Sequence, residues 1–431
     1  MLATTELIRE AAGPGRLRRL LPGVLASVPL YQRHAGLIDS IQSESLLLDA
    51  FRRLPTITKH DIRRGFPENF LGPAMSLDQL LAEGRVEIEH TSGTSEERTP
   101  LLLELGWWPV QEARALRLNA RVSQVLDRNP EARRATLTSP TCNSEVCYTG
   151  TPSLADRTVG ATRFLSRSRH PFLWDAAELG RITAEALDWA PVFLDLDPVY
   201  GAVWARYCLR EGVSLPSLEF ILCSYESLSV VHRALLEAAF RVPVYNLYGS
   251  TETGHLLMED EPGRMRPSLE TAWLDVPDPD AEGIGELEVT TLTHQYMPLV
   301  RYRIGDLVQE DQQPDGTCYR LHGRARDAAL TASGRRVTVS QLDQCFLGLG
   351  GIVHYQLRQT PGGGSWSLWL VPDVTPPSAG ALDRLRRRLA EQLELSAPVR
   401  IELTDSLLSE GSGKFRLVLP QHSPLRSPIR A

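Results

Sequence analysis

The pattern that most restricts the fold is an alternation of strands and a helix near the middle of the chain. Two β-rich apolar runs, EFILCS (Glu219–Ser224) and VPVYNLYG (Val242–Gly249), flank VVHRALLEAAF (Val230–Phe240), in which apolar residues recur at helical spacing. A strand, a helix and a second strand in this order predict a crossover between parallel strands, with helices on the faces of the sheet. Because similar alternation extends from about Val86 to Gly323, we expect an α/β fold.

The segments on either side follow other patterns. Residues up to about Arg53 indicate helices, and Thr58 with Asp61 forms a capping-box pattern that starts a short helix; Lys59, in its first turn, reads as a solvated surface lysine. GELEVTTL and LVRYRIGDLV indicate strands of a more antiparallel section. Past Gly323 the order strand, helix, two strands, helix and strand predicts a compact α+β domain. We therefore expect a large N-terminal domain, 1–325, with mixed sheets flanked by helices, and a small C-terminal domain, 326–431.

Composition excludes several classes of function. The chain has 42% hydrophobic and 23% charged residues, and no apolar run approaches the roughly 20 residues that span a bilayer. A net charge of −7 argues against a nucleic-acid partner. The first residues mix acids with arginines and resemble no signal peptide, which predicts a cytoplasmic protein without a membrane partner. Six cysteines without a CxxC pair predict buried free thiols, with a zinc site of distant residues left open.

Three separated segments carry side chains suited to a nucleotide. The first, HTSGTSEERTP, surrounds a glycine with short hydroxyls and ends in a cation, which is either a phosphate-binding loop or a plain turn. Its candidate residues are Thr91, Ser92, Gly93, Thr94, Ser95 and Arg98. The second, YNLYGSTETG, follows a buried strand, where ligands of open α/β sheets bind. Its candidates are Tyr248, Gly249, Ser250, Thr251 and Glu252, and the Glu252 carboxylate suits Mg²⁺.

The third segment combines RYRIGDLV with HGRARD. Asp306 stands directly after Ile-Gly at a strand end, where a carboxylate accepts both hydroxyls of a ribose, and Arg324 suits a ribose or a phosphate. Each segment alone is common, but their order and spacing are not.

Together these segments resemble the adenylate-forming acyl ligases, and within them the phenylacetate-CoA ligase-like branch, which includes proteins described as coenzyme F390 synthetases. TSGTSEERTP, YGSTETG, RYRIGDL, GRARD and GSGKF resemble, in order, that superfamily's phosphate loop, nucleotide and magnesium motif, ribose aspartate, hinge and catalytic lysine. LPTITKHDIRRGFP and GRRVTVSQLDQCF resemble two further segments of the branch, so the similarity covers roughly residues 50 to 420.

The resemblance implies a reaction and its cofactors. A carboxylate attacks the α-phosphate of ATP in the presence of Mg²⁺, pyrophosphate leaves, and the acyl-AMP passes its acyl group to a thiol of coenzyme A or of a carrier-protein phosphopantetheine. It makes Lys414, Thr251 and Glu252 catalytic, and Arg326 the hinge about which a mobile C-terminal domain rotates, although relatives have Asp or Lys there. Only two of the 46 basic residues are lysine, Lys59 and Lys414, which fits a specific need for an ammonium group.

Departures from the family pattern leave several interpretations open. Relatives have a second glycine and a lysine in the phosphate loop, where this chain has Glu96-Glu97-Arg98, so we expect an altered loop closed by hydroxyls and Arg98. Tyr225 either stacks on adenine, with Glu226 near the base, or is a core aromatic residue. The remaining candidates either recognise ring substituents of a small aryl acid or are structural: Asn143, Ser144 and His255. An adenylating ligase with an amine acceptor and a nucleotide-binding protein without catalysis remain the alternatives.

Overall fold

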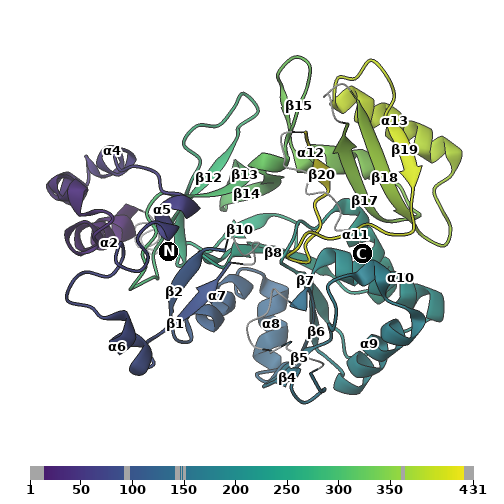
Figure 1. Ribbon diagram of the computed structural model, residues 1–431, viewed down its shortest axis with the longest axis horizontal. Helices are drawn as coiled ribbons and strands as arrows, with labels where there is room; N and C mark the ends of the chain where they lie inside the picture. The colour runs from purple at the N-terminus through teal and green to yellow at the C-terminus, as the bar shows by residue number, and fades with distance from the viewer. Residues whose placement is uncertain are drawn as a thin grey trace. The chain divides into compact units, whose positions relative to one another are not determined.

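The computed structural model describes residues 14–91, 98–140, 146, 148, 152–360 and 365–421. The chain packs into two compact units, each built from two segments (Figure 1). The first unit comprises Met1–Ser123 with Tyr248–Arg320, and the second comprises Gln124–Leu247 with Leu321–Ala431. This division does not follow the predicted domain boundary between residues 325 and 326, which stays a prediction. The predicted α/β fold class is confirmed.

Short helices open the first unit, in agreement with the helical pattern before Arg53. The side chains of Leu17, Leu21 and Leu25 are fully buried on one face of the first of these helices. The helices of this unit are α2 (Pro14–Ser27), η1 (Gln32–Leu37), α3 (Ile38–Gln42), α4 (Leu47–Arg52), α5 (Lys59–Arg63), α6 (Leu77–Ala82), α7 (Trp107–Leu116) and the start of α8 (Ala120–Arg128). The predicted capping box is present at the start of α5, where the Thr58 amide donates to the Asp61 carboxylate over 2.8 Å.

The strands of the first unit are mostly antiparallel, as predicted for the section around Asp306. β12 pairs with β11 on one side and with β13 on the other, and β10 pairs with both β9 and β14. The strands are β1 (Val86–His90), β2 (Pro100–Glu104), β9 (Gly254–Glu259), β10 (Met265–Pro267), β11 (Ala272–Asp275), β12 (Ile284–Thr291), β13 (Tyr302–Gln313) and β14 (Gly316–Arg324). β1 and β2 form a separate antiparallel pair that flanks the predicted phosphate loop.

The second unit contains the predicted crossover. β7 (Phe220–Cys223) and β8 (Val244–Ser250) are parallel neighbours, and α11 (Val230–Phe240) connects them. β6 (Phe193–Leu196) and β3 (Arg134–Leu137) extend this parallel sheet, followed by β5 (Thr162–Phe164) and β4 (Thr158–Val159). All four residues of β6 and of β7 are buried, as expected for strands covered on both faces by helices. The covering helices include α9 (Ala176–Trp189) and α10 (Pro198–Glu211).

The rest of the second unit has the predicted α+β pattern. Its sheet has the order β19-β18-β17-β20, and α13 covers one face of it (Figure 1), burying Leu385 and Leu389 against Leu368 and Leu370. The elements are η4 (Ala325–Asp327), β15 (Ala329–Leu330), β16 (Arg336–Val337), α12 (Val339–Asp343), η5 (Gln344–Phe346), β17 (Ile352–Gln359), β18 (Trp366–Pro372), α13 (Ala379–Gln392), β19 (Arg400–Leu403) and β20 (Val418–Leu419).

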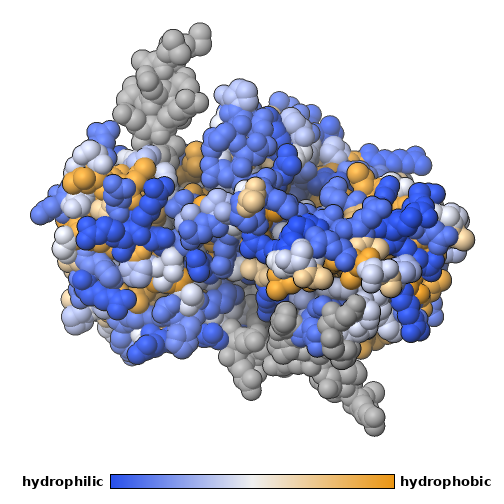
Figure 2. All heavy atoms as spheres, turned by 90° about the horizontal axis from the view of Figure 1, so that it is seen from above, coloured by the Kyte–Doolittle hydropathy of each residue, from blue (hydrophilic) through white to orange (hydrophobic). Residues whose placement is uncertain are grey.

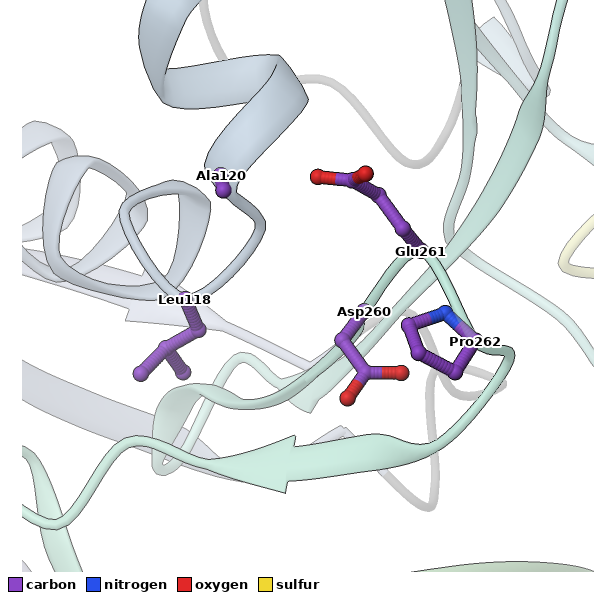
Figure 3. Close-up of a pocket in the computed structure, with 5 residues that line it drawn as sticks. All are labelled: Leu118, Ala120, Asp260, Glu261 and Pro262. Atoms are coloured by element: carbon purple, nitrogen blue, oxygen red, sulfur yellow. The ribbon is translucent and has the colours of Figure 1, made fainter. Parts of the chain in front are cut away.

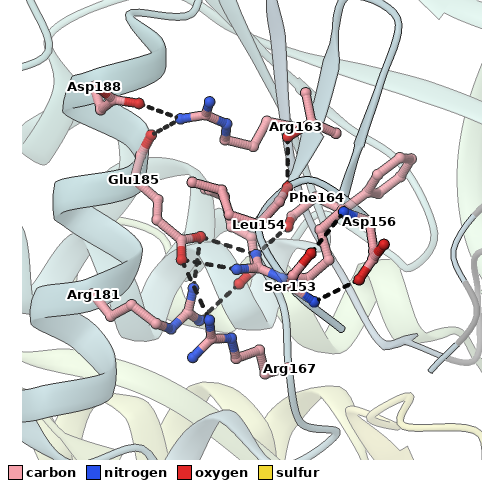
Figure 4. Close-up of polar contacts among 12 residues, drawn as sticks. Ser153, Leu154, Asp156, Arg163, Phe164, Arg167, Arg181, Glu185 and Asp188 are labelled. Carbon is pink, nitrogen blue, oxygen red and sulfur yellow. Dashed lines mark hydrogen bonds and ion pairs between the residues drawn. The ribbon is translucent and has the colours of Figure 1, made fainter. Parts of the chain in front are cut away.

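A buried ionic network fastens the edge of the parallel sheet to α9 (Figure 4). The fully buried Arg157 guanidinium makes two bonds to Glu185, of 2.9 and 2.8 Å, and a third to the Phe164 carbonyl. Arg163 beside it binds Asp188 over 2.7 Å. Because a buried guanidinium without its carboxylate would be strongly destabilising, this network holds β5 at a fixed position on α9.

Two observations concern the helices and the surface of the described residues. No helix among these residues is long and apolar enough to cross a bilayer. On the face shown in Figure 2 hydrophilic residues predominate, and hydrophobic residues appear only in small groups.

Candidate functional site

The nucleotide motif YGSTETG forms a tight turn between β8 and β9 in the first unit. The Thr253 amide donates to the Ser250 carbonyl over 3.1 Å, and the two hydroxyls of these residues lie 3.0 Å apart. A Cβ atom on Gly249 would lie 2.2 Å from the carbonyl oxygen of Gly254, which no side chain tolerates. The glycine therefore permits the close approach that places Thr251 and Glu252 at the tip of the turn.

Glu252 is a buried carboxyl group at the tip of this turn. Its side chain is 3% exposed, and its Oε1 atom accepts from the Lys59 ammonium over 2.9 Å and from the Tyr302 hydroxyl over 2.9 Å. Burial raises the pKa of a carboxyl group, but the charge and hydrogen bond of Lys59, with bonds from the backbone and from Ser250, outweigh it and lower the pKa of Glu252 to about 2. Glu252 is therefore a buried anion near neutral pH.

The expectation that Lys59 is merely a solvated surface lysine was wrong. Ile57 forms a parallel bridge to Tyr302, and its amide donates to the Arg301 carbonyl over 3.1 Å, so the segment before α5 is fixed beside β13. The capping box then starts α5 at Lys59, whose ammonium faces Glu252. Two sequence signals pointed to Lys59: the rarity of lysine in the chain, and the resemblance of LPTITKHDIRRGFP to a segment of the phenylacetate-CoA ligase-like branch.

Trp107 and His294 support the same turn and were not among the predicted site residues. A Cβ atom on Gly254 would lie 2.9 Å from the Trp107 ring, so the turn packs directly on that indole. The Trp107 and His294 rings stack with centroids 4.2 Å apart, and His294 Nε2 lies 3.1 Å from the Glu252 carbonyl oxygen. Since a carbonyl only accepts, this nitrogen carries the hydrogen. The other ring nitrogen lies 3.7 Å from Glu104 Oε2, so His294 lies between β2 and the turn.

The structure brings together two predicted nucleotide-binding residues, of which Asp306 was predicted to bind the ribose. The Tyr248 hydroxyl, on β8, donates to Asp306 Oδ2, on β13, over 2.7 Å. Asp306 is buried, and Tyr248 is half-buried. The Tyr248 hydroxyl thus orients the Asp306 carboxylate, and binding of a ribose by this pair stays a prediction.

Most of the predicted phosphate loop lies outside the described residues. Ser92, Gly93, Thr94 and Ser95 fall in the undescribed stretch 92–97, while Thr91 is buried and Arg98 is exposed at its two ends. Thr91 and Thr99 close the base of the loop, because the Thr99 amide donates to the Thr91 hydroxyl over 3.0 Å. Asn143 and Ser144 also lie outside the described residues.

His255, the third predicted pocket residue, lies in an aromatic environment. It follows the nucleotide turn on β9, is nearly buried, and its ring centroid is 5.0 Å from that of Trp108. Glu112 Oε1 lies 4.0 Å from His255 Nε2. The imidazole thus has one aromatic and one anionic neighbour, the surroundings that would suit a planar, polar ligand.

A cavity of 450 Å³ in the first unit contains none of the predicted residues (Figure 3). It is lined by Leu118, Ala120, Asp260, Glu261 and Pro262. Two carboxylates on its wall would repel a carboxylic acid, and Asp260 is already bound by Arg264 and Arg266. We therefore do not assign the acid-binding site to it.

In the second unit, Lys414 lies on a tight turn that is closed on itself. The Glu410 amide donates to the Lys414 carbonyl over 2.7 Å, and the Gly413 amide donates to the Glu410 carbonyl over 2.9 Å. The Lys414 ammonium donates to the carbonyl oxygen of Tyr225 over 3.1 Å. The next amide, that of Phe415, donates to Glu226 Oε1 over 2.6 Å.

Two acids accompany Lys414, Asp197 and the half-buried Glu226. Asp197 is fully buried and caps α10, accepting from the Val199 amide over 2.9 Å. Burial raises the pKa of Asp197 to about 7, although the α10 amides and Lys414 act to lower it. Burial and the charge of Asp197 raise the pKa of Glu226 well above its ordinary value, again against the charge of Lys414. The single ammonium of Lys414 therefore lowers the pKa of two carboxyl groups, in both cases by less than burial raises it.

Tyr225 has an unusual backbone conformation. Its φ of 72° lies in the left-handed region, which costs a bulky residue on the order of 1–3 kcal/mol and is found mostly at functional sites. Its hydroxyl donates to Asp195 Oδ2 over 2.9 Å, and its side chain is only partly buried. The ring is anchored at its far end, and stacking on adenine stays a prediction.

The remaining predicted residues adjoin η4. Arg324 immediately precedes η4 and is half-buried, whereas the guanidinium of Arg326 is 60% exposed and lies 3.7 Å from Asp327. Asp327 also pairs with Arg416, two residues after Lys414. A single carboxylate thus connects the predicted hinge residue Arg326 to Arg416, which lies between Lys414 and β20.

The described residues contain no cluster of three or more His, Cys, Asp and Glu side chains arranged to bind a metal. Within the same ranges, four cysteines are free and buried, as predicted: Cys208, Cys223, Cys318 and Cys345.

No protein-family model matches the chain, but two curated proteins are similar to it. Phenylacetate-coenzyme A ligase of Thermus thermophilus is 28% identical over 273 residues, which are 54% of this chain and 61% of that protein. Protein CapK of Staphylococcus aureus is 31% identical over 131 residues, 28% of this chain and 29% of CapK. The matched region spans less than two thirds of either relative.

Solved structures extend the similarity in fold to nearly the whole chain. 2-Hydroxyisobutyryl-CoA ligase, in a postadenylation state with R3-HIB-AMP, superimposes with a TM-score of 0.69 at 18% identity, covering 96% of this chain and 90% of that one. The anthranilate CoA ligase AuaEII, bound to anthranoyl-AMP, gives a TM-score of 0.54 at 17% identity over 76% and 64%. The chain is thus similar in sequence to a phenylacetate-coenzyme A ligase and shares the fold of two CoA ligases, in agreement with the resemblance of its motifs to the phenylacetate-CoA ligase-like branch of the adenylate-forming superfamily.

Proposed function

We propose that the protein is an ATP-dependent acid–thiol ligase that converts a small carboxylic acid into an acyl-AMP and then into a thioester. The observation that carries the proposal is Glu252, a buried carboxylate kept ionised by Lys59 at the tip of the nucleotide turn. A permanent buried anion is costly to maintain, and such groups concentrate at functional sites. The relatives in this branch and fold include ligases named for acyl-CoA products.

In the first step the acid's carboxylate oxygen attacks the α-phosphorus of ATP, and the bond to pyrophosphate breaks. Two anions must approach each other, so the protein has to supply positive charge and hydrogen-bond donors. Thr251 and Ser250, at the turn, would donate to phosphate oxygens, and Asp306, oriented by Tyr248, would accept from the ribose hydroxyls. Arg98 and the loop hydroxyls would add further donors.

The donor set of the turn fits Mg²⁺. This ion prefers hard oxygen ligands and is commonly held by one or two carboxylates together with substrate phosphates. Glu252, ionised and buried, would supply that carboxylate. When bound with ATP, the ion would neutralise part of the phosphate charge.

Lys414 would supply the remaining charge. Its ammonium is a compact donor on a flexible stem, which suits the negative charge that develops on the α-phosphate better than a planar guanidinium does. In the second step a thiolate attacks the carbonyl carbon of the acyl-AMP, AMP leaves, and the thiol's proton is released. We propose coenzyme A as the acceptor, because three of the similar proteins are named as CoA ligases; a carrier-protein phosphopantetheine offers the same thiol.

For the acid we propose an aryl compound. His255 beside Trp108 would form an aromatic wall with one polar position, which favours a planar ring over a long aliphatic chain. Phenylacetate and anthranilate, the acids in the names of two of the similar proteins, are of this kind.

The first experiment is ATP–pyrophosphate exchange across benzoic, phenylacetic, hydroxyaryl and aminoaryl acids, with aliphatic acids as controls. We expect exchange that depends on one aryl acid and on Mg²⁺. The thioester product would then be sought with coenzyme A and, separately, with a phosphopantetheinylated carrier protein. Exchange with aliphatic acids alone would refute the aryl proposal, and no exchange with any acid despite ATP binding would refute the proposed adenylation.

A further inference from the structure

Side chains of the segment 124–247 bind backbone carbonyl groups of the turn that carries Lys414. The Ser139 hydroxyl donates to the Ser412 carbonyl over 2.9 Å, and the Tyr200 hydroxyl donates to the Gly413 carbonyl over 3.2 Å. Gly413 has a φ of 84°, and a Cβ atom there would lie 2.1 Å from Ser139 Oγ. The turn therefore fits tightly, with room only for glycine at that position.

One of these contacts involves an acidic side chain. Hydroxyl groups bind Ser412 and Gly413, but the amide immediately after Lys414 donates to a carboxyl oxygen, Glu226 Oε1, over 2.6 Å. The carbonyl oxygen of Tyr225, the residue before Glu226, accepts from the Lys414 ammonium. Residues 225 and 226 thus hold both the backbone and the side chain of Lys414.

The backbone of this pair is shaped for that contact. The left-handed φ of Tyr225 and the bond from the Glu226 amide to the Ser224 carbonyl, 2.8 Å long, form a sharp reversal directly after β7. Asp195 fixes this reversal by accepting from the Ser224 and Tyr225 hydroxyls over 2.8 and 2.9 Å. Strain held in place by such contacts is typical of residues that position others.

We infer that Glu226 is a positioning residue for Lys414: its carboxylate holds the turn so that the ammonium is directed for the adenylation step. The sequence had suggested a place for Glu226 near the adenine base, and the inference gives it a different partner. It rests on the proposed function, because Lys414 is assigned to adenylation there. Burial and the charge of Asp197 raise the pKa of Glu226, and the nearby charge of Lys414 opposes them, so the two residues are close enough to interact.

The inference predicts different effects on the two half-reactions. We expect Glu226→Ala to lower kcat for acyl-AMP formation by about 100-fold, the loss caused by a small misplacement of a catalytic group, while KM for ATP changes less than about twofold. Transfer from supplied acyl-AMP to the thiol should be unchanged, because that step does not require Lys414 in this position. Glu226→Gln keeps an accepting oxygen and should restore most of the adenylation rate.

Three results would overturn it. A raised KM for ATP with unchanged kcat would make Glu226 a base contact, and equal losses in both half-reactions would make it merely structural. An unchanged adenylation rate in Glu226→Ala would show that Glu226 does not position Lys414. Glu237→Ala, which removes an exposed carboxylate on α11, is the matched control.

A readout independent of the reaction separates this inference from the proposed function. In the unliganded protein, hydrogen exchange of the Phe415 amide should be slow, and at least about tenfold faster in Glu226→Ala than in Glu237→Ala. If the wild type adenylates no acid but the amide responds in this way, the proposed function fails and the contact stands. If the amide is equally protected in both variants, the inference fails whatever the enzyme does.

Discussion

The only two lysines of the chain lie in different units, and each lies near a carboxyl group. The net pKa shifts of those carboxyl groups are nevertheless opposite. Beside Lys59, the pKa of Glu252 falls to about 2. Beside Lys414, the pKa of Asp197 rises to about 7, and that of Glu226 rises well above its ordinary value. Burial raises the pKa in all three cases, so the difference lies in what each lysine binds.

Lys59 bonds directly to one carboxylate, which also accepts from Tyr302. Lys414 bonds instead to the carbonyl of Tyr225, and two acids share its charge at longer range. A lysine in a direct ion pair fixes a permanent anion, whereas a lysine bound to a neutral oxygen keeps its ammonium for another partner. We propose that Lys59 maintains the charge of Glu252 and that Lys414 acts on a ligand, and four substitutions test this difference.

The largest effect should come from Lys414→Ala. Loss of a donor aimed at developing charge costs about 10²–10³-fold in kcat, so acyl-AMP formation should fall by that factor with ATP binding retained. Lys414→Arg keeps the charge but not the compact ammonium and should recover little. Pyrophosphate exchange measures both variants, and full exchange by Lys414→Ala would remove this residue from the mechanism.

Lys59→Ala should mainly lower the free energy of unfolding. It leaves Glu252 as a buried anion without its cation, and we expect the free energy of unfolding to fall by about 2 kcal/mol, less than for a fully buried pair because Lys59 is 37% exposed. The double variant Lys59→Ala/Glu252→Gln should regain at least half of that loss, since no anion remains. Urea unfolding measures the cycle; additive losses would show that the pair does not interact.

The different contacts of the two lysines could not be predicted from the sequence, whereas several helices and strands could be. α11 has the predicted bounds, and β7 and β8 flank it as parallel neighbours, because a buried strand and an amphipathic helix are encoded by local periodicity. The capping box at Thr58 was likewise local. These features need only residues close together in the chain.

The partners of the site residues required contacts between distant segments. Lys59 reaches Glu252 because Ile57 bridges to Tyr302, and His294 reaches the same turn through its stacking on Trp107. Likewise, Glu226 accepts from Phe415, far along the chain. A motif can indicate which residues share a ligand, but not which neutral or charged group holds each one in place.

Asp197→Asn tests the raised pKa beside Lys414. The pKa of Asp197 is 3.8 ordinarily and about 7 in the fold, so the folded protein binds the extra proton and stability from this group is lost as pH rises toward 7. Between pH 7 and 6 the wild type should gain about 1 kcal/mol of unfolding free energy from Asp197. Asparagine also caps helices and does not titrate, so the variant should lack this gain. The same pH dependence in both proteins would contradict the assignment.

A buried histidine pair in the second unit gives the smallest effect and the opposite sign. His232 on α11 and His354 on β17 are both fully buried, with Nε2 of the first 3.0 Å from Nδ1 of the second. One nitrogen must donate and the other accept, which two neutral rings can do. Burial lowers the pKa of His232 to about 3, and burial with the charge of His232 lowers that of His354.

His232→Gln should therefore weaken the acid sensitivity of the fold. Because the pKa of His232 is depressed, the unfolded chain takes up protons first, and stability present above pH 6.5 is lost as pH falls. Between pH 7 and 6 the wild type should lose about 0.7 kcal/mol through His232, a loss that the variant avoids whatever its absolute stability. Urea unfolding at both pH values, compared with Asp197→Asn, separates the two contributions by sign. If both substitutions shifted the pH dependence in the same direction, the buried acid near Lys414 would have to be ionised at pH 6, and the contrast between the two lysines would not hold.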